Sequence, residues 1–154
     1  MCFWIFRGIF KKKSKLVEPT IQLVDIPKVK PFSLIDLNLA SSILLDKLEE
    51  MEDEKAEIYL PDEDMKIYKK EEVINCYKLQ EVNSIKYIAE VHDCDDFAAE
   101  LFGKFAGLVW TNVHALNWFY DETPSFWWIE PQTKKISRTL ETWQGCEIRF
   151  FLGR

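Results

Sequence analysis

The amino-acid sequence predicts an α+β domain in which helices come first and an antiparallel sheet follows. Two helical patterns occupy the first half of the chain, a third helix begins near residue 93, and strand-like runs fill residues 108–152. Runs of helices followed by runs of strands are typical of α+β folds. The length of 154 residues suits one domain with an appendage. We place the appendage at residues 1–32 and the domain at residues 33–154.

The composition bounds the class of function. Hydrophobic residues make up 47% of the chain and aromatic residues 14%, enough to fill a substantial interior or to line a cleft. The net charge of −6 argues against a general nucleic-acid-binding surface, which needs an excess of Lys and Arg. The four cysteines form no CxxC pair, so neither a zinc knuckle nor a redox dithiol is predicted. We expect reduced thiols in a cytoplasmic compartment.

The appendage is apolar and basic. Residues 1–15 carry five basic side chains and no acid, and the apolar residues precede the basic ones, the reverse of a secretory signal. One interpretation is a foot over residues 1–13 that contacts a membrane surface or a partner, with Cys2 as a lipidation site. The other is a first element packed on the core beside solvated lysines. Residues 18–32 contain three prolines and are expected to be an extended connector.

Within the domain, apolar spacing and turn residues predict the order of the elements. Ser33 is expected to cap a helix over residues 34–54, whose apolar face points to the core. Asp93 is expected to cap a helix over residues 93–107. The remaining predicted elements are a strand at 56–60, a helix at 70–80, a strand at 108–121 paired with one at 126–132, and a strand at 146–152.

Cys94 stands at the predicted start of the third helix. The N–H groups at a helix start carry partial positive charge, which stabilises a thiolate and makes it nucleophilic. Of the two histidines, His92 is too close in sequence to approach Cys94 across a cleft, whereas His114 on the next strand can face the helix tip. Glu130, on the partner strand, is placed to orient the imidazole. Cys, then His, then a polar orienter is the chain order of papain-type thiol catalysis.

Each of these residues also has a structural interpretation. A cysteine is often a small hydrophobic residue of the core, a strand histidine is often held by structural hydrogen bonds, and Glu130 can be a strand-end carboxylate. Most of the aromatic residues are expected in two packed layers, with Trp118 or Trp128 bordering a cleft for a peptide or for sugar rings. Asn117 is a further polar candidate near the site.

Three short motifs favour the catalytic interpretation. HDCDDFA, HALNW and WIEPQT together resemble the C-terminal domain of the Marasmius oreades agglutinin, a fungal lectin, and the resemblance covers about residues 55–152. That domain is a calcium-dependent cysteine protease of papain-like fold, and related stand-alone proteins occur in phages and prokaryotes. The resemblance implies that Cys94 is the nucleophile, His114 the general base and Glu130 the third member. The sugar-binding trefoil repeats of the agglutinin are missing, so lectin activity is not implied.

Calcium is the cofactor that the resemblance implies. Several acids surround the thiol and would raise its pKa, and a bound Ca²⁺ with oxygen ligands would reverse that effect. The candidate ligands are Asp95, Asp96 and the amide of Gln132, with Glu130 as a further candidate that cannot both bind calcium and orient the imidazole. Alternatively, Asp93 caps the helix while Asp95 and Asp96 complement its dipole.

The predicted function is therefore that of a calcium-dependent papain-like cysteine hydrolase acting on a peptide or protein. His114 takes the proton of Cys94, the thiolate attacks an amide carbonyl, and the resulting acyl-enzyme is hydrolysed. The Cys94 backbone N–H is the expected oxyanion donor. The alternatives are a non-catalytic binding or structural module of the same fold and an amidase of cell-wall peptides. By the same resemblance, a homodimer is a further expectation.

Overall fold

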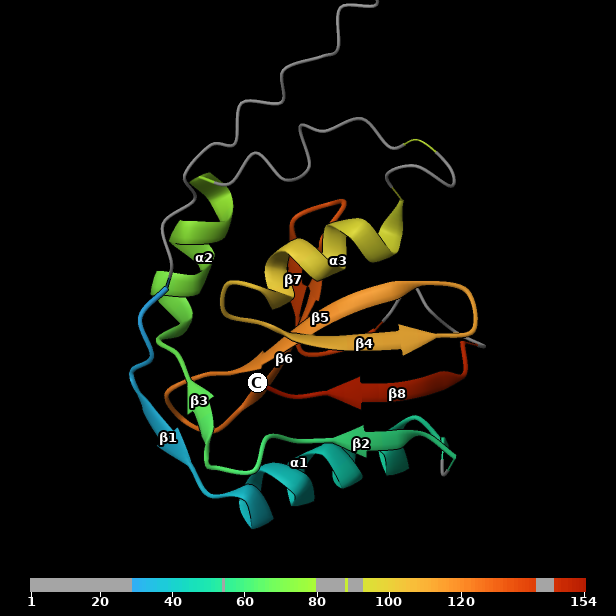
Figure 1. Cartoon of the computed structure of the whole chain (residues 1–154), viewed down its shortest axis with the longest axis horizontal. Coiled ribbons are helices and arrows are strands. Elements are labelled where there is room, and N and C mark those ends of the chain that lie inside the picture. Colours follow the sequence, from blue (N-terminus) through green and yellow to red (C-terminus); the bar gives the residue numbers. More distant parts are fainter. Residues whose placement is uncertain (1–28, 54, 80–87, 89–92, 141–145) are drawn as a thin grey trace, which may run out of the picture.

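The computed structural model describes residues 29–53, 55–79, 88, 93–140 and 146–154. The helices in these residues are α1 (Leu37–Glu50), α2 (Lys70–Leu79) and α3 (Cys94–Phe102). The strands are β1 (Ser33–Ile35), β2 (Glu57–Tyr59), β3 (Met65–Ile67), β4 (Gly107–Thr111), β5 (Ala115–Tyr120), β6 (Phe126–Glu130), β7 (Lys135–Ser137) and β8 (Ile148–Leu152). Figure 1 shows α1 and α3 on opposite sides of the strands β4, β8 and β2.

Several predictions fall outside the described residues. They are those for the foot at residues 1–13, for Cys2, for most of the connector at 18–32 and for His92. Among the helices that the structure does describe, none is both long and apolar enough to cross a membrane.

The main sheet has six strands in the order β2-β8-β4-β5-β6-β7. Its neighbouring strands are antiparallel except for β2 and β8, which run parallel. Strands β1 and β3 form a separate antiparallel ribbon. The predicted α+β class with a mostly antiparallel sheet is confirmed.

Each face of the sheet is covered by an apolar layer. Helix α1 buries Ala40, Leu44 and Leu48 against one face, where Trp118 and Phe151 are also buried. Helices α2 and α3 bury their apolar sides against the other face, around Phe119 and Ile129. Leu116, Trp118 and Tyr120 share the α1 side, as strand alternation predicts. Since Trp118 is 1% exposed, it is a core residue and does not border a cleft.

The start of α1 differs from the sequence-based prediction. The cap is Asp36, whose carboxylate accepts hydrogen bonds from the backbone N–H groups of Asn38 and Leu39. Ser33 instead begins β1, where it pairs with Ile67. The local cap signal of Ser33 is overridden because residues 33–35 gain a partner strand that is distant in sequence.

The predicted strand over residues 108–121 is two strands. Strand β4 ends at Thr111, and β5 begins at Ala115. The Thr111 hydroxyl accepts the backbone N–H of His114 at 2.8 Å and that of Val113 at 3.2 Å, which closes a tight turn. Such local side-chain bonds compete with strand pairing. His114 therefore lies in the turn that leads into β5, and not within a strand.

Helix α3 is shorter than predicted, since it ends at Phe102 and not near residue 107. Gly107 already belongs to β4, and a Cβ atom there would overlap the indole ring of Trp118. The glycine lets the strand backbone lie directly against the indole. This close contact packs the start of β4 against the core, and it places the start of β4 a few residues after the end of α3.

Candidate active site

The start of α3 is fixed by a capping box. The Asp93 carboxylate accepts the backbone N–H of Asp95 at 3.4 Å, and the Asp96 carboxylate accepts the backbone N–H of Asp93 at 3.2 Å. Both bonds satisfy N–H groups that a helix start would otherwise leave unpaired. Cys94 is thereby the first residue of the helix, as the sequence predicted.

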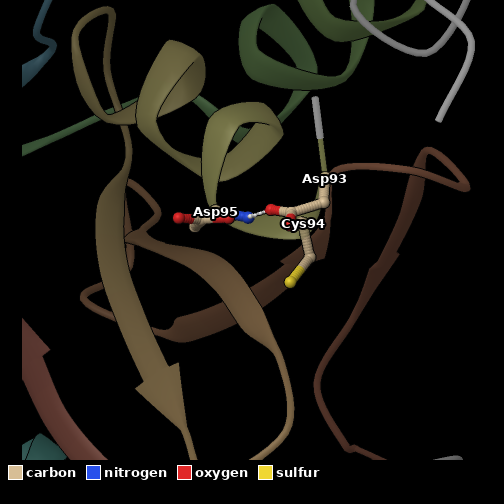
Figure 2. Close-up of side chains that lie close together, drawn as sticks. All are labelled: Asp93, Cys94 and Asp95. Carbon is tan, nitrogen blue, oxygen red and sulfur yellow. Dashed lines mark hydrogen bonds between the residues drawn. The ribbon is translucent and has the colours of Figure 1, made fainter. Parts of the chain in front are cut away.

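The thiol of Cys94 is half-buried and faces the sheet. It packs against an apolar group made of Ala98, Leu108 and Ala115. Figure 2 shows that the sulfur leaves the helix on a different side from the Asp95 carboxylate. The structure therefore brings the nucleophile candidate against the first residue of β5.

The pKa of Cys94 reflects opposing influences. Burial raises the pKa of the thiol, the backbone N–H of Ala115 lowers it by bonding to the thiolate, and the charges of Asp93 and Asp95 raise it. The balance lies above the usual value for cysteine. Without a change in these charges, the resting thiol keeps its proton at neutral pH.

The buried His114 forms a pair with the partly buried Glu130. Nε2 of His114 lies 2.8 Å from Oε2 of Glu130, and His114 is only 8% exposed. The other carboxylate oxygen of Glu130 accepts the backbone N–H of Gln132 at 3.0 Å. The Tyr77 hydroxyl donates to the Glu130 carbonyl at 2.9 Å. Because both of its carboxylate oxygens are hydrogen-bonded, Glu130 holds the imidazole of His114 in one orientation. The Nδ1 atom of His114 is then directed away from Glu130.

Ala115 connects these two halves of the site. It follows His114 directly in the chain, and its backbone N–H is the group that bonds to the Cys94 thiolate. The structure thus places the thiol beside Ala115, and it places the neighbouring His114 in a hydrogen bond with Glu130. This arrangement contains a thiol, an imidazole and a carboxylate, which are the three groups that thiol-dependent acyl transfer requires.

The candidate metal ligands are distributed differently from the predicted set. In the described residues, donor atoms of Asp93, Cys94 and Asp95 lie within 4.8 Å of one another. Asp96 is outside this group, because one of its oxygens serves the helix cap. The two carboxylates suit a hard cation such as Ca²⁺, whereas a thiol does not. Among the described residues, Asp93 and Asp95 are the two carboxylates of this group that suit calcium.

A pocket of about 570 Å³ adjoins Glu130. Gln132, the third predicted metal ligand, lines this pocket together with Trp128. Of the two tryptophans considered at a cleft, Trp128 borders this pocket although its own surface is only 3% exposed. The remaining lining residues are Leu116, Ile129, Thr133, Lys135, Ser137, Thr139 and Leu140.

Asn117 joins α3 to the sheet beneath it through two side-chain hydrogen bonds. Its Nδ2 donates to the backbone carbonyls of Ala98 in α3 and Gly107 in β4, both at 2.9 Å, and the residue is fully buried. These bonds fasten the helix that carries Cys94 to the sheet. The position of Asn117 on the predicted strand shortly after His114 was the sequence signal for this residue. No sequence signal marked the contribution of Tyr77 to Glu130.

Comparisons with known proteins support the fold. No protein-family model matches the chain, and no curated protein matches it. Among solved structures, a chain described as the PSL1a–E64 complex matches at 21% identity with a TM-score of 0.54, covering 64% of this chain and 43% of that chain. A lectin from Polyporus squamosus, bound to the human-type influenza-binding epitope Neu5Acα2-6Galβ1-4GlcNAc, matches at 22% identity with a TM-score of 0.51. That match covers 63% of this chain and 42% of the lectin.

These likenesses concern the fold alone. The chain spans about two fifths of the length of either matched chain. The predicted relation to a fungal lectin is confirmed at the level of the fold.

Replacing Asp95 by Asn is expected to lower the pKa of Cys94, because it removes one of the charges that oppose the thiolate. The pH dependence of iodoacetamide alkylation, followed at Cys94 by mass spectrometry with chelator present, measures this pKa. The midpoint should move to lower pH in Asp95→Asn and stay in place in Asp62→Asn, which changes an exposed acid elsewhere. An unchanged midpoint in Asp95→Asn would show that this carboxylate has no influence on the thiol.

Proposed function

We propose that the protein is a papain-like cysteine hydrolase that cleaves amide bonds in peptides. Cys94 is the nucleophile, His114 the general base and Glu130 the orienting carboxylate. The observation that carries the proposal is the pair of His114 and Glu130 at 2.8 Å, set beside the residue whose amide faces the Cys94 thiol. A buried histidine bonded to a carboxylate is the usual orienting arrangement of such sites.

The proposed reaction begins with transfer of the Cys94 proton to Nδ1 of His114. The thiolate attacks the substrate carbonyl carbon, and the backbone N–H of Cys94 stabilises the oxyanion. When the C–N bond breaks, the leaving amine takes the proton from His114. A water molecule, deprotonated by His114, then attacks the thioester and releases the carboxylic acid and the thiol. Since the pKa of Cys94 is raised, the base has to act as the bond forms.

One of the structural neighbours supports this choice. PSL1a forms a complex with E64. E64 carries an epoxide, an electrophile that thiolates open, so the compound is a suitable probe for the same chemistry at Cys94. The chain covers only part of PSL1a, and the transfer to this protein is part of the proposal.

A non-catalytic binding module is the second candidate. The raised pKa of Cys94 favours it, because a protonated thiol held among carboxylates is a weak nucleophile. The lectin from Polyporus squamosus binds a sialylated glycan. A binding module of this fold would keep the aromatic surfaces and leave the thiol inert.

Alkylation of the intact protein separates these candidates. We expect E64 to label Cys94 faster than it labels the buried Cys76 or the half-buried Cys146, because Cys94 packs against Ala115, the chain neighbour of the proposed base His114. His114→Ala should slow labelling of Cys94 by roughly 10²-fold or more, within the usual contribution of a general base. Glu130→Gln should slow it less, since the imidazole keeps a hydrogen-bond partner. The rates are measured by mass spectrometry of the labelled peptides.

The internal cysteines and folding controls make this result decisive. Each variant is first compared with the wild type by circular dichroism and thermal melting. Equal labelling of Cys94 and Cys146 in the wild type, unaffected by His114→Ala, would identify an inert thiol and favour the binding module.

Calcium dependence is part of the proposal. The carboxylates of Asp93 and Asp95 would hold the ion, with Asp96 and Gln132 as the further predicted ligands, and its charge would favour the Cys94 thiolate. We expect calcium to raise the melting temperature relative to chelator, because an ion that binds the folded state stabilises it. The rise should disappear in Asp95→Asn and persist in Asp62→Asn. A melting temperature that ignores calcium in the wild type would contradict this part of the proposal.

A further inference from the structure

Three aromatic side chains form a row across one face of the sheet. They are Trp110 in β4, Phe150 in β8 and Tyr59 in β2, and we call them the aromatic row. Trp110 pairs directly with Phe150, and the two rings are stacked with centroids 6.0 Å apart. Phe150 pairs with Glu57, which places Tyr59, two residues further along β2, on the same face. The Tyr59 ring meets the Phe150 ring edge-on at 6.2 Å.

The aromatic row begins beside the thiol. Trp110 is the direct cross-strand partner of Ala115, and such partners have Cβ atoms about 4.5–5.5 Å apart. Ala115 in turn bonds to the Cys94 thiolate through its backbone N–H. Cys94 and Phe150 also pack against the same apolar group of Ala98, Leu108 and Ala115. A molecule whose carbonyl carbon lies at the Cys94 sulfur can therefore extend along the row.

Both ends of the aromatic row are exposed to solvent, and Phe150 between them is partly buried. Trp110 is 37% exposed and Tyr59 is 51% exposed. Trp118, Phe126 and Trp128, on neighbouring strands, are at most 3% exposed. Core packing accounts for the buried rings, whereas much of the surface of Trp110 and Tyr59 faces solvent. Exposed aromatic side chains next to a reactive group are the usual components of a binding surface.

The spacing of the aromatic row fits an extended peptide. Alternate side chains of an extended chain lie about 6.8 Å apart on one side, and the ring centroids are spaced 6.0 and 6.2 Å. Carboxylates flank both ends of the row, Glu57 next to Tyr59 and Asp93 and Asp95 next to Cys94. A peptide with apolar side chains facing the rings and basic side chains between them would complement the apolar row and its flanking carboxylates.

We propose that the aromatic row is the substrate-binding surface of the hydrolase, and that it selects extended peptides with apolar side chains at alternate positions. The proposal rests on the proposed function and names its substrate class. Trp110 is the specificity-determining residue nearest to the thiol, and Tyr59 marks the far end of the surface.

Two reagents of different size test the aromatic row at the same thiol. E64 joins its epoxide to a leucyl side chain, whereas iodoacetamide has no side chain to bind. Trp110→Ala should lower the rate of Cys94 labelling by E64 by roughly tenfold, as expected for removal of an aromatic contact residue, and leave the iodoacetamide rate within about twofold. Trp110→Phe should restore most of the E64 rate. Leu45→Ala, which removes a side chain 57% exposed on α1, is the matched control and should change neither rate.

The pattern of the two rates decides the outcome. Equal loss with both reagents would mean that Trp110 acts on the thiol itself, and no loss with either would mean that the row does not bind; both results overturn the proposal. Protection of the wild type, but not of Trp110→Ala, by Neu5Acα2-6Galβ1-4GlcNAc would assign the row to a sugar and overturn it as well.

A second measurement tests peptide binding by the aromatic row without a reactive thiol. Its result therefore holds even if the proposed catalytic function is wrong. In Cys94→Ser, the indole N–H signal of Trp110 is followed by nuclear magnetic resonance during titration with two peptides of equal composition. Acetyl-Leu-Lys-Leu-Lys-amide has alternating apolar side chains, and acetyl-Leu-Leu-Lys-Lys-amide does not. A signal shift that saturates with the first peptide and at a clearly higher concentration of the second supports the proposal. Equal response to both, or none, overturns it.

Discussion

The two hydrogen bonds of the Asn117 side chain are the interaction on which the site depends. They join the carbonyls of Ala98 and Gly107 in a fully buried setting, and so fix α3 against the β4–β5 hairpin. A buried carbonyl left without its donor costs about 1–3 kcal/mol, which makes any other seating of the helix unfavourable. With α3 seated in this way, its first residue meets the first residue of β5. The position of Cys94 therefore follows from a structural bond one turn further along the helix.

The acids around Cys94 stabilise the start of α3 and disfavour the thiolate. Asp93 and Asp96 build the cap that starts α3, and that cap sets Cys94 at the helix tip. Burial raises the pKa of the thiol, and the charges of Asp93 and Asp95 raise it further. The backbone amide of Ala115 acts in the opposite direction and lowers the pKa. With this balance the thiol keeps its proton, and neutralising the carboxylates would lower its pKa.

The parts of the site set by local sequence were predictable. The cap at Asp93 and the helix start at Cys94 depend on residues within one turn, and the pairing of the strands around Trp118 and Trp128 follows from their apolar pattern. The start of α1 was not predictable, because β1 forms only through its distant partner β3. The break at Thr111 depends on one hydroxyl that turns back on the backbone.

Exposure was the property that sequence could least provide. Trp110 and Trp118 are similar residues in similar apolar runs, yet one is 37% exposed and the other 1%. Their faces are set by the strand break at Thr111 and by which side of the sheet each helix covers. The substrate-binding surface proposed for the aromatic row therefore had no sequence signal of its own, whereas the candidate triad had one in the order of Cys94, His114 and Glu130.

In the proposed mechanism Glu130 holds His114 so that Nδ1 accepts the proton of Cys94, and the tautomer of the imidazole tests this most directly. Nitrogen-15 nuclear magnetic resonance distinguishes a proton on Nε2 from one on Nδ1, and the chain has only two histidines to assign. The proposed mechanism predicts that neutral His114 carries its proton on Nε2 and donates it to Glu130. A proton on Nδ1 of the neutral ring would leave no acceptor there for the Cys94 proton and would contradict the mechanism.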